Sequence, residues 1–182
     1  CSYRQMGTET GRMSAASPNL QQVPRSADFR RLFRAREGYT LVVADFSQVE
    51  LRVAAELSGE KRMLEAYKAG RDLHTETAAL MAGIDIGDVN KAQRQSAKVA
   101  NFGLLYGAGP ATLRKQAVAQ YGIDMELEEA KGIVQGFRSA YPKLYDWQTE
   151  EGNKTTKAVF TRYGRRRMLT GFNDKYTTRI NT

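Results

Sequence analysis

The pattern of apolar and polar positions divides the chain into a short extended part and a long helical part. Residues 1–36 are rich in Ser, Gly, Asn, Gln and Arg, which predicts an extended, loop-like segment with its Arg and amide side chains pointing outward. Residues 39–45 are a β-branched run typical of a buried strand, and this run ends in Asp45. A strand end fixes the position of an acidic side chain, so Asp45 is a candidate for chemistry.

From residue 48 onward the pattern becomes helical, and capping residues suggest the boundaries. Gly59 and Gly83 suit helix ends, while Asp72 and Asn90 suit helix starts. Pro110 suits the first turn of a further helix. The expected helices cover 48–58, the stretch up to 70, 73–81, 91–106, a stretch from 110, 126–140 and 142–157, and two short strands cover 159–161 and 167–169. The pattern predicts a mostly α-helical α+β chain.

Charge and composition narrow the classes of function. A formal net charge of +8 attracts polyanions, and nucleic acid is the first partner to consider, although charge alone also fits a solvated basic protein. One cysteine and one histidine, His74, exclude an internal disulfide and a histidine-based metal cage. The sequence has no long apolar run and no secretion leader, so we expect a cytoplasmic protein without a membrane partner.

The helix expected over 91–106 carries the strongest local signal. Arg94, Lys98, Phe102 and Tyr106 recur every four residues, so they drift slowly around one broad face. The other face is small and apolar. Two cations followed by two aromatic rings would suit a nucleoside triphosphate laid along the helix, with its phosphates on the cations. The spacing alone equally fits a solvated basic helix whose aromatic residues belong to the core.

Three further residues are weaker candidates when taken alone. Asp45 and Glu50 could supply oxygen ligands to Mg²⁺, but a helix cap and a surface ion pair explain them more simply. His74, near the start of its expected helix, could donate to a phosphate, although a lone histidine is more often structural.

Several long motifs resemble, in order and at compatible spacing, the DNA polymerases of the polymerase I type (family A). The resemblance covers essentially the whole chain. The motifs are Thr10-Gly-Arg12-Met-Ser, Pro18-Asn19-Leu-Gln21, Asp45-Phe-Ser-Gln-Val-Glu-Leu-Arg52, Gly70-Arg-Asp-Leu-His74-Thr-Glu-Thr77, Arg94-Gln-Ser-Ala-Lys98-Val-Ala-Asn-Phe102-Gly-Leu-Leu-Tyr106-Gly107 and Tyr163-Gly-Arg-Arg-Arg167.

The resemblance implies a fragment of a right-hand polymerase fold. It assigns residues 1–58 to the palm, with a primer–template contact loop and the first carboxylate motif. Residues 59–158 would be the helical fingers, and residues 159–182 an incomplete return towards the palm.

The resemblance also implies a function and its residues. The function is template-directed DNA synthesis from deoxynucleoside triphosphates on a primer–template, with two Mg²⁺ ions. The catalytic residues implied are Asp45, Lys98 and Arg94, with Asp45 and the carbonyl of Phe46 as metal ligands. The nucleotide contacts implied are Ser47, Gln48, Glu50, His74, Arg94, Lys98, Phe102 and Tyr106, and the DNA contacts are Arg12, Asn19, Gln21, Arg31, Tyr106 and Gly107.

One departure from the family limits this expectation. The second metal-binding acid of the family follows a histidine in a His-Asp pair, and His74, the only histidine here, is not followed by Asp. We therefore expect the chain alone to bind nucleotide or DNA weakly and not to polymerise. The missing palm segment would be supplied in cis or in trans, in a bacterial or phage-infected cell.

Two alternative hypotheses about the function remain at this point. A single-subunit RNA polymerase has similar motifs but usually a small residue in place of Glu50 and Tyr in place of Phe102. A basic, helical nucleic-acid-binding module without catalysis is the other.

Overall fold

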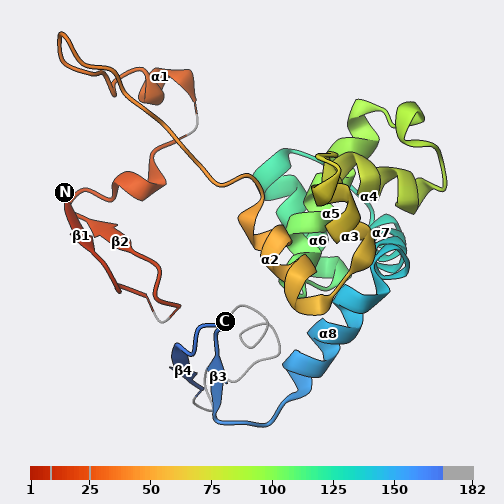
Figure 1. The fold of residues 1–182 in the computed structure, drawn as a ribbon. Coiled ribbons are helices and arrows are strands. Elements are labelled where there is room, and N and C mark those ends of the chain that lie inside the picture. The colour runs from red at the N-terminus through yellow and green to blue at the C-terminus, as the bar shows by residue number, and fades with distance from the viewer. Residues whose placement is uncertain (9, 25, 170–182) are drawn as a thin grey trace.

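A body of packed helices follows an outlying N-terminal segment in the computed structural model, which describes residues 1–8, 10–24 and 26–169 (Figure 1). The elements are β1 (Ser2–Arg4), β2 (Ser14–Ala16), η1 (Leu20–Gln22), α1 (Ala27–Arg30), α2 (Val49–Ser58), α3 (Lys61–Lys68), α4 (Leu73–Ala82), η2 (Ile86–Asp88), α5 (Lys91–Leu105), α6 (Pro110–Gln116), the π-helical turn η3 (Ala117–Tyr121), α7 (Leu127–Ala140), α8 (Pro142–Asn153), β3 (Ala158–Phe160) and β4 (Arg166–Met168). The prediction of a mostly α-helical α+β chain is confirmed.

The capping residues act where the sequence suggested. The Asp72 side chain accepts a hydrogen bond from the backbone of α4, and Asn90 forms a capping box with Gln93 at the start of α5. Gly59 and Gly83 adopt the left-handed conformation that ends α2 and α4. Local chemistry therefore fixes these four helix boundaries.

Helix α5 packs against α2, α4, α6 and α7, so it forms the centre of the body. At Gly103, a Cβ atom would lie 2.7 Å from Leu113 Cδ1 and 2.9 Å from Gln116 Oε1, which explains why glycine stands where α5 meets α6. The fully buried core residues include Leu51, Ala55, Met63, Ala66, Leu73, Ala100, Leu113, Ala117, Ala130 and Leu144.

The predicted buried strand over residues 39–45 is wrong. This segment has no regular structure and is exposed, with Val42 at 87% and Val43 at 91% exposure. None of the four described strands pairs with it, since β1 pairs with β2 and β3 with β4. An unpaired strand cannot satisfy its backbone groups within a sheet, so the β-branched pattern alone does not produce one.

Two antiparallel hairpins lie outside the helical body. In the first, Tyr3 faces Ala15, in a segment that we had expected to be only loop-like. In the second, Val159 faces Arg167, and its strands lie one residue before the two predicted ones. Residues 170–182 of the predicted return segment lie outside the described residues.

Two further features differ from the prediction. Helix α8 ends at Asn153 rather than near residue 157, and the pattern of apolar positions did not predict the π-helical turn η3. Among the described residues, no helix has the length and apolar character needed to cross a membrane.

Candidate nucleotide-binding site

Helix α5 has two different faces, as its sequence pattern predicted. Ala97, Ala100 and Leu104 are buried in the core. On the other face, Arg94 is exposed and Lys98, Phe102 and Tyr106 are half-buried. Two cations followed by two aromatic rings therefore lie along one accessible side of the central helix.

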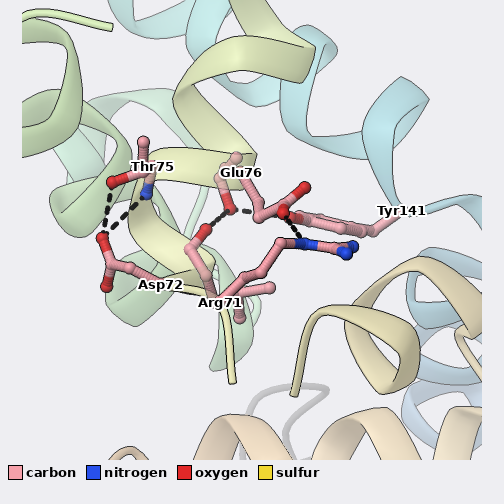
Figure 2. A network of polar contacts seen from close by, with 7 residues as sticks. Arg71, Asp72, Thr75, Glu76 and Tyr141 are labelled. Carbon is pink, nitrogen blue, oxygen red and sulfur yellow. Dashed lines mark hydrogen bonds and ion pairs between the residues drawn. The ribbon is translucent and has the colours of Figure 1, made fainter. Parts of the chain in front are cut away.

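Arg94 is held by an ion pair that the sequence did not indicate. Its Nε atom donates to Asp72 Oδ2 at 2.8 Å. Burial raises the pKa of Asp72, but hydrogen bonds from Thr75 and Arg94 outweigh it and bring this pKa down to about 2. Figure 2 shows the Asp72 carboxylate turned towards Thr75 at the start of α4. The two Nη groups of Arg94 have no hydrogen-bond partner among the described residues, so they are free to bind an anion.

His74 lies beside this pair and is only 4% exposed. Its Nδ1 atom lies 2.8 Å from the Asn101 side-chain nitrogen, and its ring centroid lies 5.6 Å from that of Phe102. Burial lowers the pKa of His74, the nearby charge of Asp72 opposes this shift, and the charges of Arg94 and Lys98 lower the pKa further. The structure thus brings His74 together with the cations of α5, while its role in binding a phosphate stays a prediction.

Lys98 points towards an aromatic ring that sequence reasoning missed. Its Nζ atom lies 5.8 Å from the centre of the Tyr121 ring, which is within range of a cation–π contact. Tyr121 belongs to the turn η3, and the only available signal was an aromatic residue in a helical stretch.

Glu50, Arg12 and Tyr106 form a second cluster. Arg12 Nη2 donates to Glu50 Oε1 at 2.5 Å, although 38 positions separate the two residues. Tyr106 interacts with both partners, and its pKa is raised to about 12, mainly by burial and then by its hydrogen bond to Glu50. A residue assigned to DNA and two assigned to the nucleotide therefore meet at the end of α5.

The turn before α2 is held by two side chains that the sequence did not single out. Arg52 Nε donates to the Ser47 carbonyl at 2.9 Å, and Tyr67 Oη donates to Gln48 Oε1 at 3.1 Å. The Arg52 guanidinium also lies over the Tyr67 ring at 4.2 Å. Gln48 itself adopts the left-handed conformation, with φ of 52°. These contacts fix Ser47 and Gln48 at the start of the helix that carries Glu50.

Asp45 and Phe46 are both exposed, and Phe46 is 82% exposed. No group of three or more His, Cys, Asp or Glu side chains that could hold a metal ion exists among the described residues. A carboxylate and a neighbouring carbonyl are ligands that suit Mg²⁺, so the donor chemistry of these two residues fits that ion.

The residues assigned to DNA lie in several places. Gln21 is exposed, and its side chain bonds to the Ala15 nitrogen and the Met13 carbonyl, both at 3.1 Å. Asn19 accepts from the backbone of Gln21 and starts η1. Arg31 pairs with Asp28 at 3.3 Å in the outlying segment, whereas Gly107 lies two residues after the end of α5, with φ of 71°.

The sequence model described as DNA polymerase family A matches residues 1–182. DNA polymerase I of Aquifex aeolicus (strain VF5) is 40% identical over 176 residues, which are 94% of this chain and 30% of that protein. The thermostable DNA polymerase I of Thermus aquaticus is 39% identical over 173 residues, which are 92% of this chain and 20% of that protein. A solved POL domain of Pol1 from M. smegmatis, in complex with DNA primer-template and dNTP, superposes with a TM-score of 0.80 at 27% identity and covers 99% of this chain and 33% of that one. The chain thus spans a third or less of each of these relatives.

Proposed function

The chain belongs to DNA polymerase family A, and from this premise we propose that it is the nucleotide-binding part of a longer enzyme that extends a DNA primer along a template. The observation that carries the proposal is the order of side chains on the accessible side of α5. Arg94 and Lys98 come first, and Phe102 and Tyr106 follow. The similarity in fold to a domain bound to primer-template and dNTP supports it.

In this proposal α5 binds the incoming deoxynucleoside triphosphate. The free Nη groups of Arg94 and the ammonium of Lys98 contact the phosphates, since guanidinium and ammonium groups pair well with phosphate oxygens. Phe102 packs on the sugar and base, and Tyr106 lies next to the new base pair. His74, beside Phe102, adds a further donor to the phosphates.

The cluster at the end of α5 sets the choice of sugar and the place of the primer. Glu50 crowds the 2′ position of the sugar and so excludes ribonucleotides. Arg12, which bonds to Glu50, contacts the primer–template near its growing end. Ser47 and Gln48 contribute the rest of the nucleotide-binding surface, while Asn19, Gln21, Arg31 and Gly107 contribute to DNA binding.

The reaction is phosphoryl transfer. The primer 3′-oxygen forms a bond to the α-phosphorus, the bond to the β-phosphate bridging oxygen breaks, pyrophosphate leaves, and the proton of the 3′-hydroxyl passes to solvent. Asp45 and the carbonyl of Phe46 would hold two Mg²⁺ ions together with ligands outside this chain, and these ions supply activation of the hydroxyl and charge neutralisation on pyrophosphate. Arg94 and Lys98 offset the charge that develops on the phosphates, which is a matter of positioning and electrostatics.

The proposal divides the chain as the resemblance did, with residues 1–58 in the palm, 59–158 in the fingers and 159–182 returning towards the palm. The remaining carboxylate ligand comes from the same polypeptide or from a second chain. This chain alone would then bind nucleotide without extending a primer. An enzyme with this function would act in the cytoplasm, where its DNA substrate lies.

Primer extension by the longer protein tests the proposal. Lys98→Gln should reduce kcat/KM for dNTP by about 10²-fold, which is typical for the loss of one electrostatic contact to a developing charge. The matched control is Lys131→Gln on α7, since Lys131 is an exposed lysine paired with Glu128. Equal losses in the two variants, or no template-dependent extension by the longer protein, would contradict the proposal.

A further inference from the structure

A buried chain of polar side chains lies behind His74. The Thr77 hydroxyl lies 2.7 Å from Tyr141 Oη and 3.0 Å from Asn101 Oδ1, and the Asn101 amide nitrogen lies 2.8 Å from His74 Nδ1. Thr77, Asn101 and Tyr141 are at most 1% exposed, and they come from α4, α5 and the start of α8. Figure 2 shows the Tyr141 ring reaching the start of α4 next to Arg71 and Glu76.

The direction of these hydrogen bonds follows from which groups can donate. Burial raises the pKa of Tyr141 to about 12, so its hydroxyl keeps its proton and donates to Thr77. The Thr77 hydrogen is directed to the Leu73 carbonyl and to Asn101 Oδ1. With its oxygen turned to Thr77, the Asn101 amide presents N–H to His74, so Nδ1 of His74 accepts. A neutral imidazole that accepts at Nδ1 carries its proton on Nε2.

The other ring nitrogen of His74 faces outward. No buried side-chain nitrogen or oxygen of the described residues lacks a partner, and Nε2 has no partner among them. The small remaining exposure of His74 therefore includes Nε2. The charges that act on the ring are those of Asp72 at the start of α4 and of Arg94 and Lys98 on α5. Arg94 and Lys98 are therefore close enough to the ring for their charges to lower its pKa.

We propose that Asn101, supported by Thr77 and Tyr141, is a positioning residue that holds His74 as a neutral imidazole with its Nε2–H directed outward as a donor to an anion. That this anion is the triphosphate rests on the proposed function, whereas the tautomer does not. A neutral donor adds a hydrogen bond without adding charge, and Arg94 and Lys98 supply the positive charge. If Nδ1 were protonated, two N–H donors would face each other without a hydrogen bond. This disfavours the charged ring, in agreement with the lowered pKa of His74.

Long-range ¹H–¹⁵N NMR of the imidazole ring tests the proposal directly. His74 is the only histidine of the 182 residues, so a preparation without a histidine tag gives one ring to observe. Nδ1 should be unprotonated and Nε2 protonated across neutral pH. A proton on Nδ1 in the unaltered chain would mean that the Asn101 amide is reversed, and the proposal would be overturned.

Asn101→Asp tests the cause, because it replaces the amide donor with a carboxylate acceptor of the same shape. The carboxylate should draw the proton to Nδ1 and raise the pKa of His74 by about one to three units, the usual effect of an opposite charge at this distance. Asn153→Asp, with the same charge change at the end of α8, should leave the ring unchanged. Equal titration curves for the two variants would overturn the proposal.

If Asn101→Asp does not fold, Thr77→Val is the alternative variant. It removes the hydroxyl that orients the Asn101 amide, so it should give a mixture of His74 tautomers. A single Nε2-protonated form in Thr77→Val would overturn the role of Thr77.

Kinetics of the longer protein separate positioning from simple structural support. In Asn101→Asp, the neutral ring lacks a proton on Nε2, so the KM for dNTP should rise as pH passes the raised pKa of His74 while kcat changes little. In the unaltered protein this KM should show no such step above about pH 7. The proposed triphosphate contact has its own test, because adding dTTP to the 182-residue chain should shift the Nε2–H resonance. If the tautomer is as stated but dTTP leaves this resonance unchanged, the positioning proposal stands and the proposed contact fails.

Discussion

Gln148 of α8 should contribute strongly to stability through the end of α5. Its Nε2 group donates to the carbonyls of Leu104 and Leu105 at 2.8 and 2.7 Å, and its side chain is buried. The last carbonyls of a helix have no partner within the helix, so a buried helix end needs such a donor. The Leu104 carbonyl also accepts from the backbone nitrogens of Tyr106 and, at 3.0 Å, of Gly107, whereas the Leu105 carbonyl has no other partner among the described residues.

The size of the effect follows from these contacts. In Gln148→Leu, the Leu105 carbonyl stays buried without a donor, which costs about 1–3 kcal/mol, and the lost bond to Leu104 costs about 1 kcal/mol more. The added apolar burial of leucine returns about 1 kcal/mol. We expect a net loss of about 2 kcal/mol in the free energy of unfolding. Gln148→Glu should cost more, about 3–5 kcal/mol at neutral pH, because a buried carboxylate would face two carbonyl oxygens.

Urea unfolding followed by far-UV circular dichroism measures both changes as shifts of the midpoint at constant slope. Gln135→Leu, at an exposed position on α7, is the matched control and should change stability by less than about 0.5 kcal/mol. The loss of stability in Gln148→Glu should become smaller as pH falls, because a protonated carboxyl can donate a hydrogen bond to one of these carbonyls. A loss below about 0.5 kcal/mol in Gln148→Leu would refute the argument that this side chain satisfies the end of α5.

Three other changes test different contacts. Asp72→Asn should lower the free energy of unfolding at pH 7 by about 1 kcal/mol, a modest value because solvent weakens the partly exposed ion pair with Arg94. The depressed pKa of Asp72 adds stability that is present above the ordinary pKa of 3.8 and is lost as pH falls towards about 2. Unfolding curves at pH 7 and 2.5 measure this, and an unchanged difference between the two pH values in Asp72→Asn would contradict it. Glu60→Gln should lower the free energy of unfolding by about 1 kcal/mol, because the two oxygens of buried Glu60 accept from the backbone at the starts of α3 and α8, including Lys143 N at 2.9 Å, and an amide keeps only one acceptor. An unchanged urea midpoint would contradict this. In the longer protein, Phe102→Tyr should raise incorporation of dideoxynucleotides relative to deoxynucleotides, because the tyrosine hydroxyl can replace the missing 3′-hydroxyl contact, and equal selectivity in the two forms would argue against the placement of α5.

The sequence predicted the helical part well because its signals are local. Asp72 and Asn90 mark helix starts through bonds to backbone atoms within three residues. The two faces of α5 follow from its helical period. The strand predicted over residues 39–45 was wrong for the opposite reason. A strand depends on a neighbouring strand, often distant in the sequence, and none of the described strands pairs with this run.

The parts of the site that the sequence did not indicate depend on contacts between distant positions. Arg94 meets Asp72 across 22 positions, and Gln148 reaches the end of α5 across more than 40. Spacing within one helix carries no information on such pairs. Asn101 was not singled out in the sequence, and only the packing of α4 beside α5 shows that it faces His74.

In the function proposed above, the accessible side of α5 binds a nucleoside triphosphate, with its phosphates at Arg94 and Lys98 and its nucleoside at Phe102. An NMR titration of the ¹⁵N-labelled chain with dTTP, and in parallel with thymidine, tests it most directly. We expect dTTP to shift the resonances of all three residues, whereas thymidine should shift only those near Phe102. Shifts confined to other elements, or equal effects of dTTP and thymidine at Arg94 and Lys98, would contradict it.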